Sequence, residues 1–154
     1  MAGEYPGSAV PAEVGPRLAD LRAHGITGFV DLTEVGELVP YSAHPAMAGA
    51  RYTRVPIRDG GVPADGDILR RALHAIDAER AGGGTVYVHC WGGVGRTGLV
   101  IACWLVRHGA TAEWALDEVQ RLYATTPKVR RLPRSPENDR QCAWVRRWAA
   151  SSRG

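Results

Sequence analysis

The chain has 154 residues, of which 45% are hydrophobic and 23% are charged, and its formal net charge is +3. This composition is typical of a folded globular domain and excludes a disordered chain, and no apolar run reaches the ~18 residues that a membrane span needs. The positive charge is carried almost entirely by arginine and forms no basic stripe with interleaved aromatic residues. We therefore expect one soluble domain over residues 1–154 that binds neither membrane nor nucleic acid.

The first third of the sequence predicts two buried strands after an irregular start. Residues 1–15 are rich in Gly, Pro and Ala and are expected to lack regular structure. Two leucines then suggest a short helix that ends at Gly25, and residues 28–32 predict a buried strand. Residues 51–57 predict a second strand. The loop between the two strands is long, and such loops usually carry function or contain a short helix.

Helices and strands alternate through the middle of the chain. Apolar residues at helical spacing predict a helix that begins near residue 69 and ends at three consecutive glycines, with Asp65 and Asp67 as its N-cap residues. Residues 85–90 are β-branched and aromatic and predict a central strand. Residues 96–109 are apolar on nearly every side and predict a helix buried against a sheet.

Two more helices are expected in the last third. Thr111 is suited to cap a helix that runs through Tyr123. The segment 135–137 supplies the N-cap, first-turn proline and acidic residue of a last helix, and residues 151–154 are expected to fray. This alternation predicts an α/β fold in a single domain, with a central, mostly parallel sheet of four to five strands flanked by helices.

A glycine-rich loop joins the central strand to the buried helix. It begins at the strand's last residue, Cys90, continues through Trp91, Gly92, Gly93, Val94 and Gly95, and reaches Arg96 at the start of the helix. Unpaired amides at a helix N-terminus favour an anion, and the glycines let successive amides turn inward. The loop therefore predicts a cradle for a phosphoryl group.

The side chains around this loop are those that covalent phosphoryl transfer requires. The helix N-terminus and Arg96 are expected to favour the thiolate of Cys90, which is the nucleophilic form. The planar guanidinium of Arg96 can hold two phosphoryl oxygens at once. The Thr97 hydroxyl can reach back toward the sulfur and stabilise it as a leaving group. His89 is expected to orient the loop rather than to transfer a proton.

The loop has two other interpretations. A Walker A loop is excluded, because Cys90 stands where its first glycine belongs and Arg96 stands where its lysine belongs. A buried, inert thiol beside helix-packing glycines is the other interpretation. The spacing H-C-x5-R-[ST]-G at a strand-to-helix junction favours the catalytic one.

The sequence HCWGGVGRTG, residues 89–98, resembles the signature loop of the cysteine-dependent protein tyrosine and dual-specificity phosphatases. The resemblance covers most of the chain, because residues 55–69 and 135–141 are also similar to segments of the small dual-specificity group, most of all its kinase-associated phosphatase branch. It implies that Cys90 is the nucleophile, Arg96 the phosphate-binding arginine and Asp59 the general acid.

The residues also suggest a proton donor independently of this resemblance. Asp59, Asp65 and Asp67 follow the second strand, and cleavage of an ester to a side-chain oxygen requires a donor for the leaving group. Asp59 lies beside two glycines on a segment that could swing over the cradle, whereas the other two are better suited to cap the next helix. Taken alone, Asp59 fits a turn-forming role equally well.

Two further features have two interpretations each. Gln141 shares a helical face with Trp144, Val145 and Trp148 and should point inward, where it could hold the attacking water or be satisfied by backbone at the edge of the core. Residues 127–136 form either a solvated loop or a positive rim around a phosphate site.

The cysteines and the missing secretory signal bear on compartment and cofactors. Cys90, Cys103 and Cys142 are an odd number without metal-ligand spacing, which argues against a disulfide framework or a zinc site. No metal or other cofactor is expected. Cys103 is expected to be an inert core residue, and the chain is expected to work in the reducing cytoplasm.

The predicted function is a metal-independent protein phosphatase that acts as a monomer through a phosphocysteine intermediate. Its partner is a phosphorylated protein, with phosphotyrosine and also phosphoserine or phosphothreonine as substrates. The segment between Cys90 and Arg96 carries no charge, which favours a single phosphoryl group over a polyphosphorylated lipid. Two alternatives remain open: a catalytically silent phosphoprotein-binding module of the same fold, and a rhodanese-like sulfurtransferase.

Overall fold

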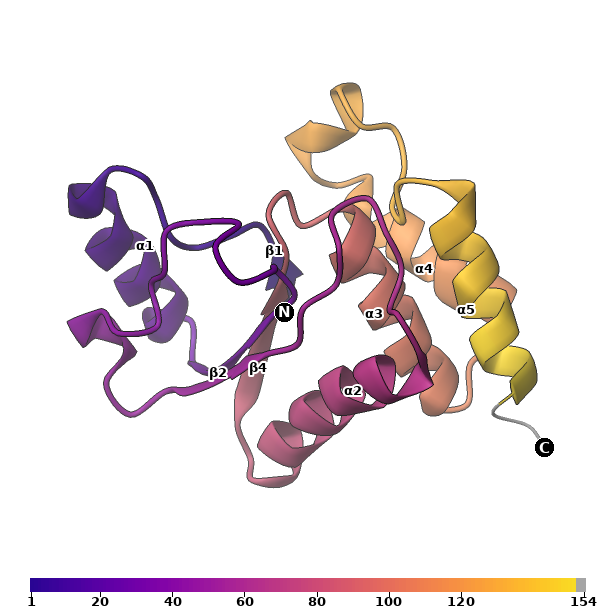
Figure 1. Cartoon of the computed structure of the whole chain (residues 1–154), viewed down its shortest axis with the longest axis horizontal. Coiled ribbons are helices and arrows are strands. Elements are labelled where there is room, and N and C mark those ends of the chain that lie inside the picture. The colour runs from indigo at the N-terminus through magenta and orange to yellow at the C-terminus, as the bar shows by residue number, and fades with distance from the viewer. Residues whose placement is uncertain (152–154) are drawn as a thin grey trace.

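The computed structural model describes residues 1–151, which build one four-stranded sheet with helices on both faces (Figure 1). The strands are β1 (Ala2–Gly3), β2 (Ile26–Asp31), β3 (Arg51–Arg54) and β4 (Thr85–His89). The α-helices are α1 (Pro11–Ala23), α2 (Gly66–Ala81), α3 (Gly95–Arg107), α4 (Ala112–Tyr123) and α5 (Asp139–Ser151). Two short 3-10 helices are η1 (Pro45–Met47) and η2 (Pro127–Arg130).

All strand pairs are parallel, in the spatial order β1-β4-β2-β3. Helix α1 covers one face, and α2 to α5 lie on the other (Figure 1). Because parallel strands end at the same edge, the loops that follow β2, β3 and β4 emerge together. The expected α/β fold with a mostly parallel sheet of four to five strands is confirmed.

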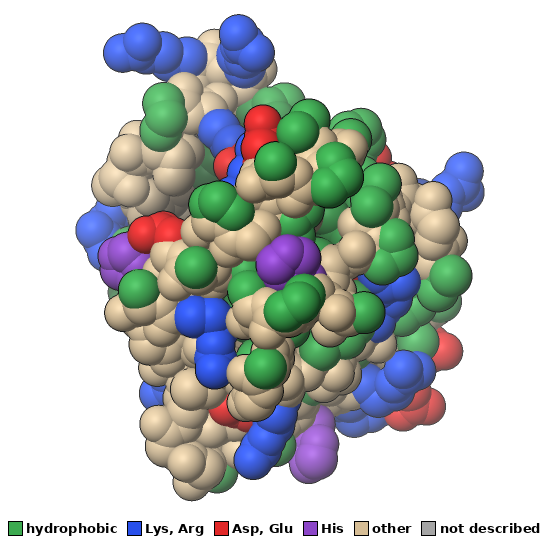
Figure 2. Space-filling model, turned by 90° about the vertical axis from the view of Figure 1, so that its left-hand side faces the viewer, with side chains coloured by type: hydrophobic (Ala, Val, Ile, Leu, Met, Phe, Trp, Pro, Cys, Tyr) green, Lys and Arg blue, Asp and Glu red, His purple; other side chains and the backbone are tan. Residues whose placement is uncertain are grey.

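The sheet separates two hydrophobic cores, and strand side chains alternate between them. Val86 and Val88 of β4 belong to the core shared with α2 and α3, whereas Tyr87 belongs to the core shared with α1. Val30 and Phe29 of β2 divide in the same way. This period of two, with apolar residues on both faces, is what a central parallel strand requires. On the outside, hydrophobic and charged side chains intermingle over the face that carries α1 (Figure 2).

The expectation that residues 1–15 are irregular is wrong. β1 pairs with β4, and α1 begins at Pro11. The Val88 N–H donates to the Met1 carbonyl at 3.0 Å, and the N–H of buried Tyr5 donates to the Trp91 carbonyl at 2.8 Å. These long-range bonds order the segment, and a two-residue strand leaves no periodicity in the sequence.

The predicted start of the last helix is also wrong. α5 begins at Asp139, and Ser135 is not its cap, because the Ser135 hydroxyl donates to the Val94 carbonyl at 2.8 Å. Ser135 is buried and precedes a cis peptide bond to Pro136. Ser151 still belongs to α5, so the predicted fraying does not begin there, and residues 152–154 lie outside the described part of the chain.

The remaining predicted boundaries agree with the structure apart from small shifts. Asp65 caps α2 and Thr111 caps α4, as expected. Asp67 is not a cap, since it pairs with Arg70 within the first turn of α2. β3 is shorter than predicted, although the N–H of Val55 still donates to the sheet at 2.8 Å. No helix within residues 1–151 is both long enough and apolar enough to cross a membrane.

Candidate active site

Glycines in the loop between β4 and α3 and in the first turn of α3 allow close contacts with other segments of the chain. Gly93 has φ +73, and a Cβ at this position would collide with the backbone carbonyl of Gly3. A Cβ at Gly98 on the first turn of α3 would likewise collide with the hydroxyl of Ser135. The loop therefore lies against β1 on one side and against the segment before α5 on the other, and neither contact leaves room for a larger residue.

Cys90 and Arg96 come together at the N-terminus of α3, as predicted. Cys90 is 3% exposed and Arg96 is 1% exposed, so the thiol and the guanidinium are both largely shielded from solvent. Burial alone would lower the pKa of Arg96, but hydrogen bonds to Glu37 and the neighbouring charge of Cys90 raise it above its usual range. A permanent positive charge is thus held beside the thiol.

Glu37 fixes the guanidinium of Arg96 in one orientation. Its carboxylate accepts from Nη1 at 2.8 Å and from Nη2 at 2.6 Å, and Nη1 also donates to the Ile57 carbonyl at 3.0 Å. The hydrogen bonds from Arg96 lower the pKa of Glu37. The Nε of Arg96 is buried without a hydrogen-bond partner among residues 1–151, so this donor is left for a ligand.

Sequence reasoning missed Glu37. It lies in the long loop after β2, and no local pattern distinguishes it from the neighbouring exposed Glu34. The only signal was the length of that loop, which the sequence analysis associated with function or a short helix. Both are present, since the loop contains η1 and supplies the carboxylate that holds Arg96.

Asp59 lies at the same guanidinium, in the loop that follows β3. Its Oδ1 is 2.8 Å from the Nη2 of Arg96, and its side chain is 62% exposed. The next residue, Gly60, has φ +62, which lets the chain turn sharply beside the carboxylate. The structure therefore brings Asp59 to Arg96 while leaving it open to solvent and able to turn toward a ligand.

Gln141 of α5 is buried and points inward, as predicted. Its Nε2 donates to the Gly61 carbonyl at 3.0 Å, and its Oε1 accepts from the Glu137 N–H at 3.1 Å. Asn138 donates to the Gly60 carbonyl at 3.1 Å. The Gln141 amide is thus hydrogen-bonded largely to backbone groups, which agrees with the interpretation that it is satisfied at the edge of the core. Together with Asn138, Gln141 holds the loop that carries Asp59.

His89 is buried beneath the loop in a hydrogen-bonded chain. Its Nδ1 lies 3.2 Å from the Cys90 carbonyl, which can only accept, so Nδ1 carries the proton and Nε2 accepts from the Tyr41 hydroxyl at 2.6 Å. Burial lowers the pKa of His89 to about 4, so the ring is neutral near pH 7. This geometry fits the orienting role predicted for His89.

Thr97, Trp91 and Lys128 complete the surroundings of the loop. The Thr97 hydroxyl is buried and has no hydrogen-bond partner within the described chain, and it lines a pocket of about 580 Å³ beside the loop. Trp91 is 58% exposed. The ammonium of Lys128 in η2 donates to the Gly92 carbonyl at 2.7 Å, so residues 127–136 border the phosphate-binding loop. This position favours the rim interpretation of that segment.

The other cysteines lie outside this arrangement. Cys103 is buried in the core on α3, as predicted, and burial raises its pKa. Cys90, Cys103 and Cys142 are all free thiols. Within residues 1–151, no group of three or more His, Cys, Asp or Glu side chains is arranged to hold a metal ion.

Residues 4–110 match the family model Tc-R-P, described as "Polymorphic toxin system, DSP-PTPase phosphatase". The chain belongs to this phosphatase family. The phosphatase loop built around Cys90 and Arg96 falls within the matched residues, as do Glu37 and Asp59. Gln141 lies outside them.

Known phosphatases resemble the chain in sequence and in fold. "Putative tyrosine phosphatase 067L" of Invertebrate iridescent virus 3 is 37% identical over 92 residues, which cover 58% of this chain and 38% of that protein. Phosphatidylglycerophosphate phosphatase PTPMT1 of Arabidopsis thaliana is 31% identical over 114 residues, which cover 73% of this chain and 32% of that protein. The chain thus spans 38% or less of the length of these two relatives.

A crystal structure of kinase associated phosphatase (KAP) superposes with a TM-score of 0.77 at 22% identity, covering 96% of this chain and 84% of that one. In that crystal structure the catalytic site cysteine of KAP is substituted by serine. At this identity the similarity establishes the shared fold, and assignment to the KAP branch stays a prediction.

Removal of the Glu37 carboxylate should destabilise the fold through Arg96. In Glu37→Ala the guanidinium stays buried but loses two of its hydrogen bonds, and breaking a buried ion pair on one side costs about 3 kcal/mol. We expect a loss of this size in the free energy of unfolding measured with urea. The control is Glu34→Ala, an exposed neighbour, which should change it by less than about 0.5 kcal/mol. Equal effects of the two substitutions would contradict the role given to Glu37.

The neutral His89 makes stability depend on pH. Its pKa is lowered from 6.5 to about 4, so below pH 6.5 the unfolded chain binds a proton that the folded chain does not. Stability is therefore fully present above pH 6.5 and falls as the pH drops toward 4, by up to about 3 kcal/mol. Urea unfolding between pH 7.5 and 4 should show a flatter dependence for His89→Gln than for the wild type. Parallel curves would rule this out.

Proposed function

We propose that the chain is a protein phosphatase that hydrolyses phosphate monoesters through a phosphocysteine intermediate. The observation that carries the proposal is the convergence of Cys90, Arg96 and Asp59 at the N-terminus of α3, with 2.8 Å between Asp59 and the guanidinium. Membership of the DSP-PTPase family and the similarity to a tyrosine phosphatase support it.

The first step transfers the phosphoryl group to sulfur. A phosphoryl oxygen takes the place of Asp59 at the Nη2 of Arg96, and a second one meets the free Nε. The Cys90 thiolate then attacks phosphorus in line, an S–P bond forms, and the P–O bond to the leaving group breaks. Asp59, once released from the guanidinium, takes up a proton from solvent, to which its side chain is open, and gives that proton to the leaving oxygen. The loop amides and Arg96 hold the equatorial oxygens while charge shifts.

The second step returns the enzyme to its starting state. Water attacks the phosphocysteine, and Asp59 takes the water's proton as general base. The S–P bond breaks, and the buried Thr97 hydroxyl donates to the departing sulfur. Gln141 contributes by holding the Gly61 carbonyl, which keeps the Asp59 loop over the site. Its direct role on the attacking water remains a proposal, since in this conformation its amide is already bonded to protein atoms.

We infer that the substrate is a phosphoprotein carrying a single phosphoryl group, with phosphotyrosine favoured and phosphoserine or phosphothreonine also accepted. The exposed Trp91 beside the nucleophile supports this, because its ring offers a flat apolar surface to an aryl group at the mouth. Lipid phosphate esters are the competing substrate class, in view of the similarity to phosphatidylglycerophosphate phosphatase PTPMT1. A silent binding module would typically lack Cys90 or Arg96, and both are present.

We further propose a monomer that works without metal or cofactor in the cytoplasm. The three free thiols support a reducing compartment, where Cys90 stays available as a nucleophile.

Two substitutions separate the nucleophile from the general acid. Cys90→Ser should abolish release of phosphate from every substrate, in the presence or absence of a chelator. Asp59→Ala should lower kcat on a phosphothreonine peptide by about 10²–10⁴-fold, because an alkoxide needs a proton to leave. It should lower kcat much less on 4-nitrophenyl phosphate, whose leaving group needs little assistance.

The measurement is steady-state release of phosphate from a phosphotyrosine peptide, a phosphothreonine peptide, 4-nitrophenyl phosphate and a phosphoinositide. Full activity of Cys90→Ser would eliminate the mechanism. Turnover of the phosphoinositide far above that of the peptides would eliminate phosphoproteins as the substrate class. Formation of thiocyanate from thiosulfate and cyanide would instead favour the sulfurtransferase alternative.

A further inference from the structure

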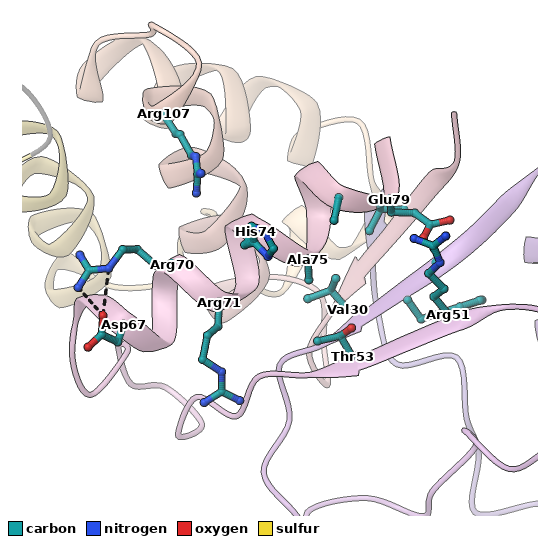
Figure 3. A pocket seen from close by; sticks show the side chains of 14 residues that line it. Val30, Arg51, Thr53, Asp67, Arg70, Arg71, His74, Ala75, Glu79 and Arg107 are labelled. Carbon is teal, nitrogen blue, oxygen red and sulfur yellow. Dashed lines mark hydrogen bonds and ion pairs between the residues drawn. The ribbon is translucent and has the colours of Figure 1, made fainter. Parts of the chain in front are cut away.

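A second pocket lies away from the catalytic loop, between α2 and β3 (Figure 3). We call it the α2–β3 pocket, and its volume is about 830 Å³. Its floor is apolar, with Val30 of β2, Val86 of β4 and Ala75 of α2 among the lining residues. Neither Cys90 nor Arg96 lines it.

Basic side chains surround this apolar floor. The basic lining residues are Arg51, Arg70, Arg71, Arg107 and His74. Two carboxylates, Asp67 and Glu79, also line it. The arginines thus outnumber the acids at the rim, and the excess charge is positive.

Three of these arginines already have anionic partners. Arg70 pairs with Asp67 at 2.6 Å, and Arg51 lies 3.3 Å from the buried carboxylate of Glu79. The Nε of Arg107 lies 3.3 Å from an oxygen of Asp77. Their charges are therefore largely compensated within the protein.

Arg71 and His74 are different. Both are exposed on α2, and neither makes a hydrogen bond or ion pair with any residue between 1 and 151. Figure 3 shows the Arg71 side chain extending away from α2, with His74 one turn further along the helix. An uncompensated guanidinium next to an apolar hollow fits a ligand that combines apolar and acidic groups.

The strand at the pocket favours a peptide as this ligand. β3 is the last strand of the sheet and pairs only with β2, so its outer edge has unpaired backbone groups in the described chain. Thr53 is exposed on β3 and lines the pocket. An extended peptide can use such an edge for backbone hydrogen bonds, which a lipid headgroup cannot do in the same repeating register.

We propose that the α2–β3 pocket docks an acidic segment of the phosphoprotein substrate. An apolar side chain of the segment fills the hollow, and a flanking carboxylate pairs with the uncompensated guanidinium of Arg71. The inference rests on the proposed phosphatase function and extends it from the phosphorylated residue to a remote part of the same substrate.

The sheet sets the separation between the two contacts. Val86 of β4 lines the pocket and precedes Cys90 by four residues, and Cys90 directly follows the strand, so at about 3.3 Å per residue the pocket begins about 13 Å from the nucleophile. A substrate must therefore carry its acidic segment at least about four extended residues from the phosphorylated one. Peptides with spacers of four, eight and twelve residues test this length.

The test compares two phosphotyrosine peptides that differ only in charge. One carries a Glu-Leu-Glu segment after the spacer, and the other carries Gln-Leu-Gln. For wild type we expect a lower KM for the acidic peptide. In Arg71→Glu the KM for the acidic peptide should rise about tenfold relative to the KM for the neutral peptide, and kcat should stay equal for the two peptides. In wild type, the difference in KM between the two peptides should shrink with added salt.

Arg121→Glu is the matched control. It makes the same change in net charge at an exposed helical arginine that does not line the pocket, and it loses only a surface ion pair with Glu118. It should leave the KM ratio of the two peptides unchanged. An equal change in both variants would reduce the effect to overall charge and overturn the docking site.

Direct binding keeps this test separate from catalysis. Fluorescence anisotropy of the unphosphorylated acidic segment should show binding that Arg71→Glu weakens about tenfold, whether or not 4-nitrophenyl phosphate is hydrolysed. Absence of that hydrolysis refutes the proposed function, whereas equal binding by wild type and Arg71→Glu refutes the docking site. Arg71-dependent binding to phosphatidylserine vesicles, without binding of the peptide, would overturn the peptide proposal in favour of a membrane surface.

Discussion

The buried guanidinium of Arg96 is the constraint on which the site depends. An arginine cannot lose its charge, so a side chain that is 1% exposed must be surrounded by acceptors. Glu37 supplies two of these acceptors, its carboxylate oxygens, and Ile57 supplies its backbone carbonyl. Asp59 supplies a carboxylate oxygen that a ligand can replace. The buried ion pair between Arg96 and Glu37 therefore fixes the geometry of the site, although both charged groups lose hydration when they are buried. Only the edge of the guanidinium that includes Nε is left for a ligand.

The parallel sheet explains how these groups meet. Glu37, Asp59 and Cys90 follow β2, β3 and β4, and parallel strands bring these loops to one edge. Elements far away in sequence then hold the loops in place: β1 lies against Gly93 of the loop that follows β4, and Gln141 of α5 binds the Asp59 loop. The groups proposed to be catalytic and their supports thus come from nearly the whole chain, and of these groups Asp59 is the exposed one.

Elements with strong local signals were predicted well. The β-branched and aromatic residues of β4, the apolar surface of α3 and the caps Asp65 and Thr111 all act over a few residues, and the structure contains each of them. The errors lie where long-range contacts decide. β1 is ordered by pairing with β4, and Ser135 is drawn away from a capping role by the Val94 carbonyl on the phosphate-binding loop.

The sequence by itself determined the loop from Cys90 to Arg96, because the spacing of these two residues and the glycines between them are local features that the family model also covers. Only the tertiary structure decided that Glu37 and Asp59 lie at the guanidinium of Arg96. It also decided that basic residues from several elements line the α2–β3 pocket. Glu37 lies 59 residues from its partner Arg96, and no local pattern records a pairing that exists only once three strands lie side by side.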